Sequence, residues 1–426
     1  MKELTTFDQI ISYLNQTLGS GDRMFRMQTM YDLYKDSFTH FPAYQIAGTN
    51  GKGSVVAYLT ALFHGDGKKV CAFVSPHLLI ETERLLINGQ PISQEQFVEI
   101  FQEVKHKIDA IQAFPIEDLS YFEWFLLLYW ELISREQPDI ALVEVGIGGL
   151  NDVTSIMNMT AGAIVSIGLD HQALLGNSLE EIAMQKAGII EENEPIFTGD
   201  FTKEANIAID YTIKAYEANL YRLHRDFDVK LIKRHEDGRT DISYKSLTGE
   251  EHTLFCPLVG DVQSENLAIA LALYEHESGS DSIDWEKVRH SLTKTFWPGR
   301  LQKLREKPLV YIDGAHNIAA VQAVLAQLAC PPFKGRKVTL VYAAQTHKNI
   351  DQVMDYLQKE YRDYPLIVSD IHVDRSAHEE NYKAYAGQFM EQEDLIELLN
   401  KESDMIYLCF GSLYFVGDLL RAFKND

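Results

Sequence analysis

Short apolar runs alternate with longer segments of helical periodicity along most of the chain. We predict strands at 44–47, 70–74, 140–145, 163–167 and 195–198, with helices between them at 55–64, 94–109, 120–134, 178–187 and 203–217. Apolar strands that alternate with helices are typical of a mostly parallel sheet covered by helices on both faces. The expected fold class is therefore α/β.

The pattern changes twice after residue 225. Polar and apolar positions alternate from about 228 to 256, which predicts an antiparallel excursion from the main sheet. Helices are predicted at 261–276 and 284–295, followed by a turn with adjacent Pro298 and Gly299. A second α/β series follows, with strands at 309–312, 337–342, 366–369 and 405–410 and a last helix from Ser412. We expect two domains, 1–297 and a smaller Rossmann-like α/β domain at 298–426.

The loop after the first strand has the composition of a phosphate-binding loop. Its residues are Gly48, Thr49, Asn50, Gly51, Lys52, Gly53 and Ser54. Glycine-rich turns at a helix start let backbone N–H groups face phosphate oxygens, and the helix dipole favours the same charge. A lysine there supplies positive charge to the outer phosphates, and a serine hydroxyl suits a Mg²⁺ shell. The loop predicts a nucleotide site of the P-loop type.

The loop departs from the usual P-loop spacing. Ile46 stands where the first glycine belongs, and Gly53 separates Lys52 from Ser54. The alternative is a glycine-rich turn that binds nothing. Glycine loses the most backbone freedom on folding, so three glycines are a costly way to build a mere turn. We therefore interpret the loop as a compact variant.

Composition excludes several classes of protein. The 426 residues carry a formal net charge of −23, which argues against a general nucleic-acid binder. The four cysteines are scattered without a CxxC pair, so neither a disulfide framework nor a zinc knuckle is expected. The N-terminus lacks an apolar targeting core, and the longest apolar run, 124–130, is too short for a bilayer. We expect a cytoplasmic protein with no membrane or nucleic-acid partner.

Polar residues follow the other predicted strands where each one ends. Ser75 follows 70–74, Glu144 closes 140–144, and Asp170 and His171 follow 163–167. Ligands collect beyond the carboxyl ends of strands in parallel α/β sheets. Carboxylate and hydroxyl oxygens suit Mg²⁺; the alternative is that these residues are hydrogen-bonded structural polar groups. Lys186 ends a helix that opens with a Ser178–Glu181 capping box, and by itself it reads as a surface cation.

Taken together, the motifs resemble those of folylpolyglutamate synthases, including the bifunctional dihydrofolate synthases, within the Mur ligase superfamily. The resemblance covers nearly the whole chain and rests on seven segments in the expected order. They are 48–54, 75–78, 143–146, 166–171, 186–189, 298–300 and 313–317.

The resemblance implies specific roles. Ser54, Ser75 and Glu144 would hold one Mg²⁺ against the phosphates of ATP, and Glu144, His171 and Lys186 would frame a second metal. In that family the lysine is carbamylated, so that CO₂ converts an amine into an anionic oxygen ligand.

Further positions match nucleotide contacts of the family. They are Asn266, Arg300, Asp313 and His316. Since the last three lie in the second domain, the resemblance implies a site that is completed by domain closure.

Three stretches depart from the family pattern. Its usual Gly-Gly-Arg-Leu-Asp reads Gly-Gly-Leu-Asn-Asp at 148–152, Val262 replaces a frequent histidine, and Asp-Lys-Asp reads His-Lys-Asn at 347–349. The metal and phosphate positions are kept, so these changes leave open which pterin acceptor is used and how strongly it binds.

The resulting hypothesis is an ATP-dependent ligase that adds L-glutamate to a folate carboxylate through an acyl phosphate, with Lys52, Glu144, His171 and Lys186 as the catalytic residues. Dihydropteroate is a second possible acceptor, and a monomer is expected. Two alternatives remain open. One is a cell-wall Mur ligase, although 47 residues before Gly48 are few for a UDP-binding domain. The other is a nucleotide-binding Mur-ligase-like protein with a different acceptor or without ligase activity.

Overall fold

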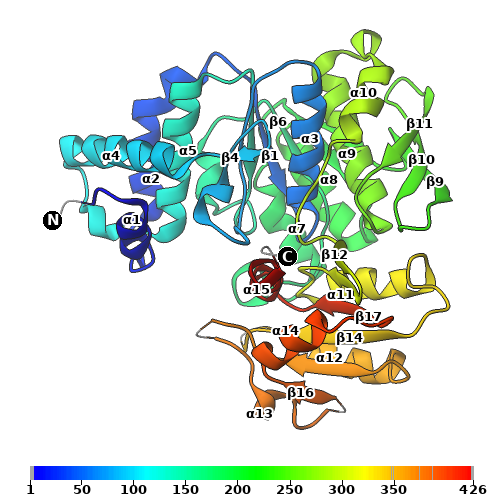
Figure 1. The fold of residues 1–426 in the computed structure, drawn as a ribbon. Coiled ribbons are helices and arrows are strands. Elements are labelled where there is room, and N and C mark those ends of the chain that lie inside the picture. Colours follow the sequence, from blue (N-terminus) through cyan, green and yellow to red (C-terminus); the bar gives the residue numbers. More distant parts are fainter. Residues whose placement is uncertain (1–3, 347, 349, 374, 386, 424–426) are drawn as a thin grey trace. The chain divides into compact units, whose positions relative to one another are not determined.

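The structure is a computed structural model that describes residues 4–346, 348, 350–373, 375–385 and 387–423 (Figure 1). The chain forms two compact units. The first contains Met1–Val229, Tyr244–His252 and Glu265–Thr295, and the second contains Lys230–Ser243, Thr253–Ser264 and Phe296–Asp426. The domain assignment of 1–297 and 298–426 stays a prediction. His347 and Asn349, two of the departures from the family pattern, lie outside the described residues.

The first unit is built on an eight-stranded sheet of order β4-β3-β2-β5-β1-β6-β7-β8. Strands β2, β5, β1, β6, β7 and β8 are parallel, and β3 and β4 add an antiparallel hairpin at one edge. The strands are β1 Ala43–Ala47, β2 Val70–Phe73, β3 Leu85–Ile87, β4 Gln90–Pro91, β5 Ile140–Glu144, β6 Ala161–Ile164, β7 Pro195–Thr198 and β8 Asn219–Arg222.

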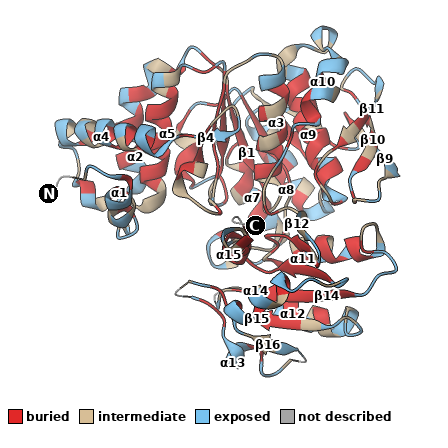
Figure 2. Cartoon of the chain, viewed as in Figure 1, coloured by how far each residue is buried: buried red, intermediate tan, exposed pale blue. Residues whose placement is uncertain are grey.

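The central strands are buried on both faces, as near-continuous apolar runs require. Every residue of β1, β2, β5 and β6 is buried (Figure 2). Helix α3 (Lys52–Gly65) joins β1 to β2, and α5 (Tyr121–Glu136) lies on the way back from β2 to β5. Right-handed crossovers place these two helices on opposite faces of the sheet. The buried face of α5, from Trp124 to Trp130, packs in the main core with α1 (Phe7–Leu14), α2 (Arg23–Tyr34) and α4 (Gln94–Ile111).

Two helices that pack on each other, α7 (Leu179–Ala187) and α8 (Lys203–Ala215), lie on the same face of the sheet as α5, because Ala43 in the core of α5 and Ala47 in the core of α7 and α8 project from one face of β1. Three further helices of this part of the chain are α6 Gln172–Leu175, α9 Val262–Ser278 and α10 Trp285–Leu292. Phe63 of α3 packs on Tyr274 of α9, so α3 and α9 share one face. Side-chain caps set where helices begin: Ser120 and Ser178 open α5 and α7 with complete capping boxes, as predicted for Ser178.

Two smaller sheets complete the fold. An antiparallel sheet of order β11-β10-β9 consists of β9 Asp228–Arg234, β10 Thr240–Lys245 and β11 Glu251–Cys256. The second unit holds a six-stranded sheet of order β12-β13-β17-β14-β15-β16. Its strands are β12 Gln302–Glu306, β13 Leu309–Ile312, β14 Val338–Ala343, β15 Leu366–Ser369, β16 Gln388–Met390 and β17 Ile406–Phe410. Its helices are α11 Ile318–Ala326, α12 Ile350–Glu360, α13 Glu379–Tyr382, α14 Gln392–Asn400 and α15 Leu413–Phe423.

The predicted α/β class is confirmed, as is the antiparallel excursion after residue 228, whose strands are joined by tight turns at 235–239 and 246–250. The sequence pattern did not reveal the β3–β4 hairpin, the edge strand β8 or the first two helices. Helix α3 begins at Lys52 rather than 55, because the phosphate-loop glycines start the helix directly. Among the described residues, every helix is too short or too polar to span a bilayer.

Candidate active site at the carboxyl edge of the large sheet

The phosphate-type loop between β1 and α3 requires glycine at its last position. Gly51 has φ +85°, in the left-handed region, and precedes the first residue of α3. A Cβ atom at Gly51 would lie 2.5 Å from Oδ1 of Asn266 and 2.8 Å from Cγ1 of Val165. The close approach places the predicted nucleotide residue Asn266 directly against the loop. The N-terminus of α3 therefore faces the carboxyl edge of the sheet with Asn266 beside it.

The segment after β6 holds this loop in shape. The N–H of Thr49 donates to the carbonyl of Ser166 (2.9 Å), and the N–H of Asn50 donates to Oγ of Ser166 (2.8 Å). The Ser166 hydroxyl donates in turn to the carbonyl of Asn50 (2.8 Å). The hydroxyl of Thr49 bonds to both backbone groups of Gly168. Sequence reasoning placed Ser166 in a motif but missed that it shapes the loop, because neither spacing nor residue type shows which strands are neighbours.

The structure brings two of the predicted residues, Lys52 and Ser75, against the buried carboxylate of a third, Glu144. Glu144, at the end of β5, is 4% exposed. Its Oε1 lies 3.8 Å from Nζ of Lys52, and its Oε2 accepts a hydrogen bond from the N–H of Ser75 (3.1 Å). Lys52 also donates to the carbonyl of Gly48 (3.1 Å). A lysine held by both the loop and the acidic residue can neutralise phosphate charge without moving far.

The hydroxyl of Ser54 is poised for an oxygen-binding ion. Ser54 is 1% exposed, and its Oγ has no hydrogen-bond partner among the described residues. Buried polar atoms nearly always have a partner, and an orphan needs an explanation. Serine hydroxyl, a carboxylate and phosphate oxygens form the hard-donor set that Mg²⁺ prefers. The residues present therefore fit the predicted magnesium site.

Lys186 is a buried amine that experiences the charge of a second lysine, which overturns its interpretation as a surface cation. It is 3% exposed at the end of α7. Burial and, to a smaller extent, the positive charge of Lys52 lower the pKa of its amine to about 7, while Asp170 and Asp152 oppose the shift. Desolvation is the main cause because a charged amine loses its hydration in the interior. Lys186 is thus within electrostatic reach of Lys52.

The remaining predicted metal ligand is His171. His171 directly precedes α6 with φ +50°, is exposed, and its backbone N–H donates to Oδ1 of Asp170 (2.8 Å). Within the described residues, no group of three or more His, Cys, Asp or Glu side chains could hold a metal ion by itself. Any metal here would depend on hydroxyl, lysine-derived or phosphate oxygens as well.

The loop from 145 to 152, which follows β5, packs against the C-terminal end of α7. A Cβ at Gly149 would lie 3.0 Å from the carbonyl oxygen of Lys186, and one at Gly188 would lie 2.1 Å from Cα of Leu150. Only glycine permits the loop to pack this closely on the helix end. Asp152 is 6% exposed and accepts hydrogen bonds from the N–H groups of Ile147 (2.9 Å) and Thr154 (3.0 Å).

In the second unit the predicted residues 300, 313 and 316 are neighbours of one another. Asp313 is buried and accepts hydrogen bonds from the N–H groups of Leu301 and Ala315, both at 2.8 Å. Burial raises the pKa of the Asp313 carboxyl, opposed by the charge of Arg300. Nδ1 of His316 lies 2.8 Å from the carbonyl oxygen of Gly314. Where this group lies relative to residues 48–54 stays a prediction.

Comparisons with known proteins agree with one another. No family model matches the chain. The chain is 30% identical over 398 residues, 90% of both chains, to the dihydrofolate synthase/folylpolyglutamate synthase of Bacillus subtilis. It is 29% identical over 377 residues, 87% of both chains, to the folylpolyglutamate synthase of Lacticaseibacillus casei. The structure of Mycobacterium tuberculosis folylpolyglutamate synthase complexed with ADP matches with a TM-score of 0.89 at 25% identity, over 99% of this chain and 98% of that one.

Proposed function

Because the chain belongs to the dihydrofolate synthase/folylpolyglutamate synthase family, we propose that the carboxyl edge of its large sheet binds ATP and activates a folate carboxylate for attack by glutamate. The protein is an ATP-dependent folate–glutamate ligase. The observation that carries the assignment of the site is the contact of Lys52 and Ser75 with Glu144, next to the buried Ser54 hydroxyl.

The reaction has two displacements. A carboxylate oxygen of the folate attacks the γ-phosphorus of ATP, the bond from this phosphorus to the bridging oxygen breaks, and ADP leaves. The amine of L-glutamate then attacks the acyl carbon, phosphate leaves, and one proton is lost as the amide forms. Two anions must meet in the first step, so positioning and charge neutralisation dominate.

The chain's own residues divide this work. The N–H groups at the start of α3 and the ammonium of Lys52 bind the phosphates, and Asn266 adjoins them. Arg300, Asp313 and His316 would contact the nucleotide from the second unit, as the resemblance implies. No covalent enzyme intermediate is needed.

Magnesium, when bound, supplies positive charge against the phosphate oxygens, and Ser54, Ser75 and Glu144 would hold it. A second metal held by Glu144, His171 and Lys186 is part of the proposal. Lys186 fits the carbamylation that this requires, since its amine has a pKa of about 7. A neutral amine can add CO₂ and release a proton, which leaves an anionic carbamate. The carbamate would be attracted by the charge of Lys52, which repels the ammonium form.

Membership of the family indicates a pterin acceptor, and two such acceptors are possible. We propose tetrahydrofolate, extended at its glutamate γ-carboxylate, with dihydropteroate as a second acceptor. A monomer in the cytoplasm completes the proposal. The alternative, a nucleotide-binding protein without ligase activity, is disfavoured because nucleotide binding alone would not require the second metal that Glu144, His171 and Lys186 would hold.

The test is a product assay. Purified protein is incubated with ATP, Mg²⁺, L-glutamate and each pterin in turn, and products are resolved by mass. We expect one added glutamate with tetrahydrofolate and glutamate-dependent ADP release. Nucleotide binding without any glutamylated product from either pterin would contradict the ligase assignment, and the Glu144→Gln variant serves as the inactive control.

A further inference from the structure

One exposed arginine contacts the loop that packs on the end of α7. Arg23 is the first residue of α2, and its Nη2 donates to the carbonyl oxygen of Asn151 at 2.6 Å. Both residues are exposed. Charge-assisted hydrogen bonds of this length are among the stronger ones, and 128 positions separate the two residues in sequence.

The helix that carries Arg23 is firmly anchored. One turn further on, the buried Arg26 pairs with the buried Glu123 of α5 at 2.8 Å. The hydroxyl of Tyr31 accepts a hydrogen bond from the N–H of Asn158 (3.2 Å). Because α2 is anchored in this way, the guanidinium of Arg23 has a fixed base from which it can hold the loop that contains Asn151.

Three consecutive residues of the loop are each held by a different partner. The N–H of Leu150 donates to the carbonyl of Gln185 (2.8 Å), directly before Lys186. The carbonyl of Asn151 accepts from Arg23, and the carboxylate of Asp152 closes the loop on itself through Ile147 and Thr154. Of these three contacts, the one with Arg23 is made by an exposed side chain. Substitution of Arg23 therefore removes it without changing the proposed metal and phosphate residues.

We propose that Arg23 is a positioning residue of the ligase. It holds loop 145–152, and through the bond from Leu150 to Gln185 it steadies the end of α7 that carries Lys186. This inference rests on the proposed function, in which Lys186 serves the reaction. Arg23 touches neither residues 48–54 nor Asn266, so it acts on turnover and not on nucleotide affinity.

The test compares Arg23→Ala, Arg23→Lys and, as a matched control at the other end of α2, Lys35→Ala. Lys35 directly follows α2 and pairs with the half-exposed Asp32 of that helix at 2.9 Å. We expect Arg23→Ala to lower kcat about tenfold with the KM for ATP unchanged, Arg23→Lys to recover most of the loss, and Lys35→Ala to match the unchanged protein. Hydrogen exchange of the peptide that contains 145–152 should be faster in Arg23→Ala alone.

Two results would overturn the inference: kcat within twofold of the unchanged protein in Arg23→Ala, or unaltered exchange of loop 145–152. Since exchange needs no substrate, it judges the contact even if the unchanged protein makes no product. Inactivity of the unchanged protein would contradict the proposed function instead.

Discussion

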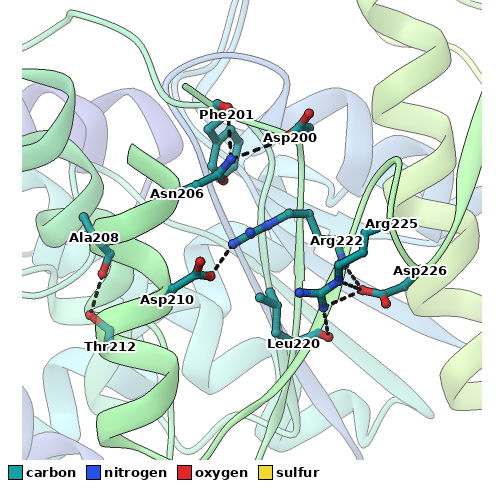
Figure 3. Close-up of polar contacts among 10 residues, drawn as sticks. All are labelled: Asp200, Phe201, Asn206, Ala208, Asp210, Thr212, Leu220, Arg222, Arg225 and Asp226. Carbon is teal, nitrogen blue, oxygen red and sulfur yellow. Dashed lines mark hydrogen bonds and ion pairs between the residues drawn. The ribbon is translucent and has the colours of Figure 1, made fainter. Parts of the chain in front are cut away.

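Two parts of the same sheet edge differ in whether their basic side chains have acidic partners. At the carboxyl end of β8, two arginines have acidic partners: Arg222, the last residue of the strand, lies 2.6 Å from Asp210 of α8, and Arg225 lies 2.6 Å from Asp226 (Figure 3). Beyond β1 and β5, the buried Lys186 has the positive charge of Lys52 as its strongest charged influence.

The difference separates structural charge from chemical charge. Paired charges at the edge of a sheet contribute modestly to stability and have no reason to bind anything. A buried amine beside a like charge costs free energy, and such groups cluster at functional sites. We call the end that holds Lys186 the uncompensated end, because the strongest charged influence on this buried amine is the like charge of Lys52, although Lys52 itself pairs with Glu144. This is therefore the end of the sheet where substrates, cations or CO₂ would supply the missing charge.

The largest effect should come from the carboxylate at the uncompensated end. Glu144→Gln removes the charge that faces Lys52 and one oxygen ligand of the proposed magnesium, so we expect kcat/KM to fall by roughly a thousandfold. Steady-state kinetics with saturating glutamate would measure it. The matched control, Asp210→Asn at the paired end, should stay within twofold; equal losses in both variants would remove the distinction between the two ends.

A smaller but still strong effect is expected at the buried amine. Lys186→Ala should lower kcat by about a hundredfold, because an oxygen ligand next to the phosphates is lost. Added acetate should restore part of the activity by supplying a carboxylate. Unchanged turnover in Lys186→Ala would show that the lysine is only structural.

The same lysine should make stability depend on pH when metal and CO₂ are absent. Below about pH 7 its amine is protonated in both states, and the folded state bears the full cost of burying the charge. Between about pH 7 and the ordinary value of 10.5, only the unfolded chain binds the proton. The free energy of unfolding should therefore rise with pH, by up to about 1.4 kcal/mol per unit.

Urea denaturation across this range would measure that slope against Lys186→Met. The variant lacks the titrating amine, so its profile should be flatter from pH 7 upward. Parallel profiles for the two proteins would contradict the buried, deprotonating lysine.

The smallest effect on activity and stability is expected at the end of β8, where Asp210 pairs with Arg222. Asp210 is half exposed, so Asp210→Ala should cost less than about 1 kcal/mol of stability and leave kcat and both KM values unchanged. Thermal unfolding and kinetics would check this. A marked loss of activity would mean that the β7–β8 end also serves the reaction.

The central strands could be predicted from the sequence because buried parallel strands are apolar throughout. Glu144 and Lys52 could be predicted as site residues because the carboxyl ends of parallel strands lie at one edge of the sheet. Sequence reasoning missed β8, whose four residues are half-buried or exposed at the sheet's edge and show no apolar run. The burial of Lys186 was also beyond its reach, since one lysine at a helix end reads as a solvated cation. Ser166 and Arg23 act through contacts more than 100 positions apart in the chain, which no local pattern encodes.

The most direct test of the uncompensated end is ¹³C NMR of the purified protein equilibrated with ¹³C-bicarbonate and Mg²⁺. The account predicts one carbamate resonance in the unchanged protein that is missing from Lys186→Met. An active enzyme without that resonance would contradict the central claim that CO₂ completes Lys186.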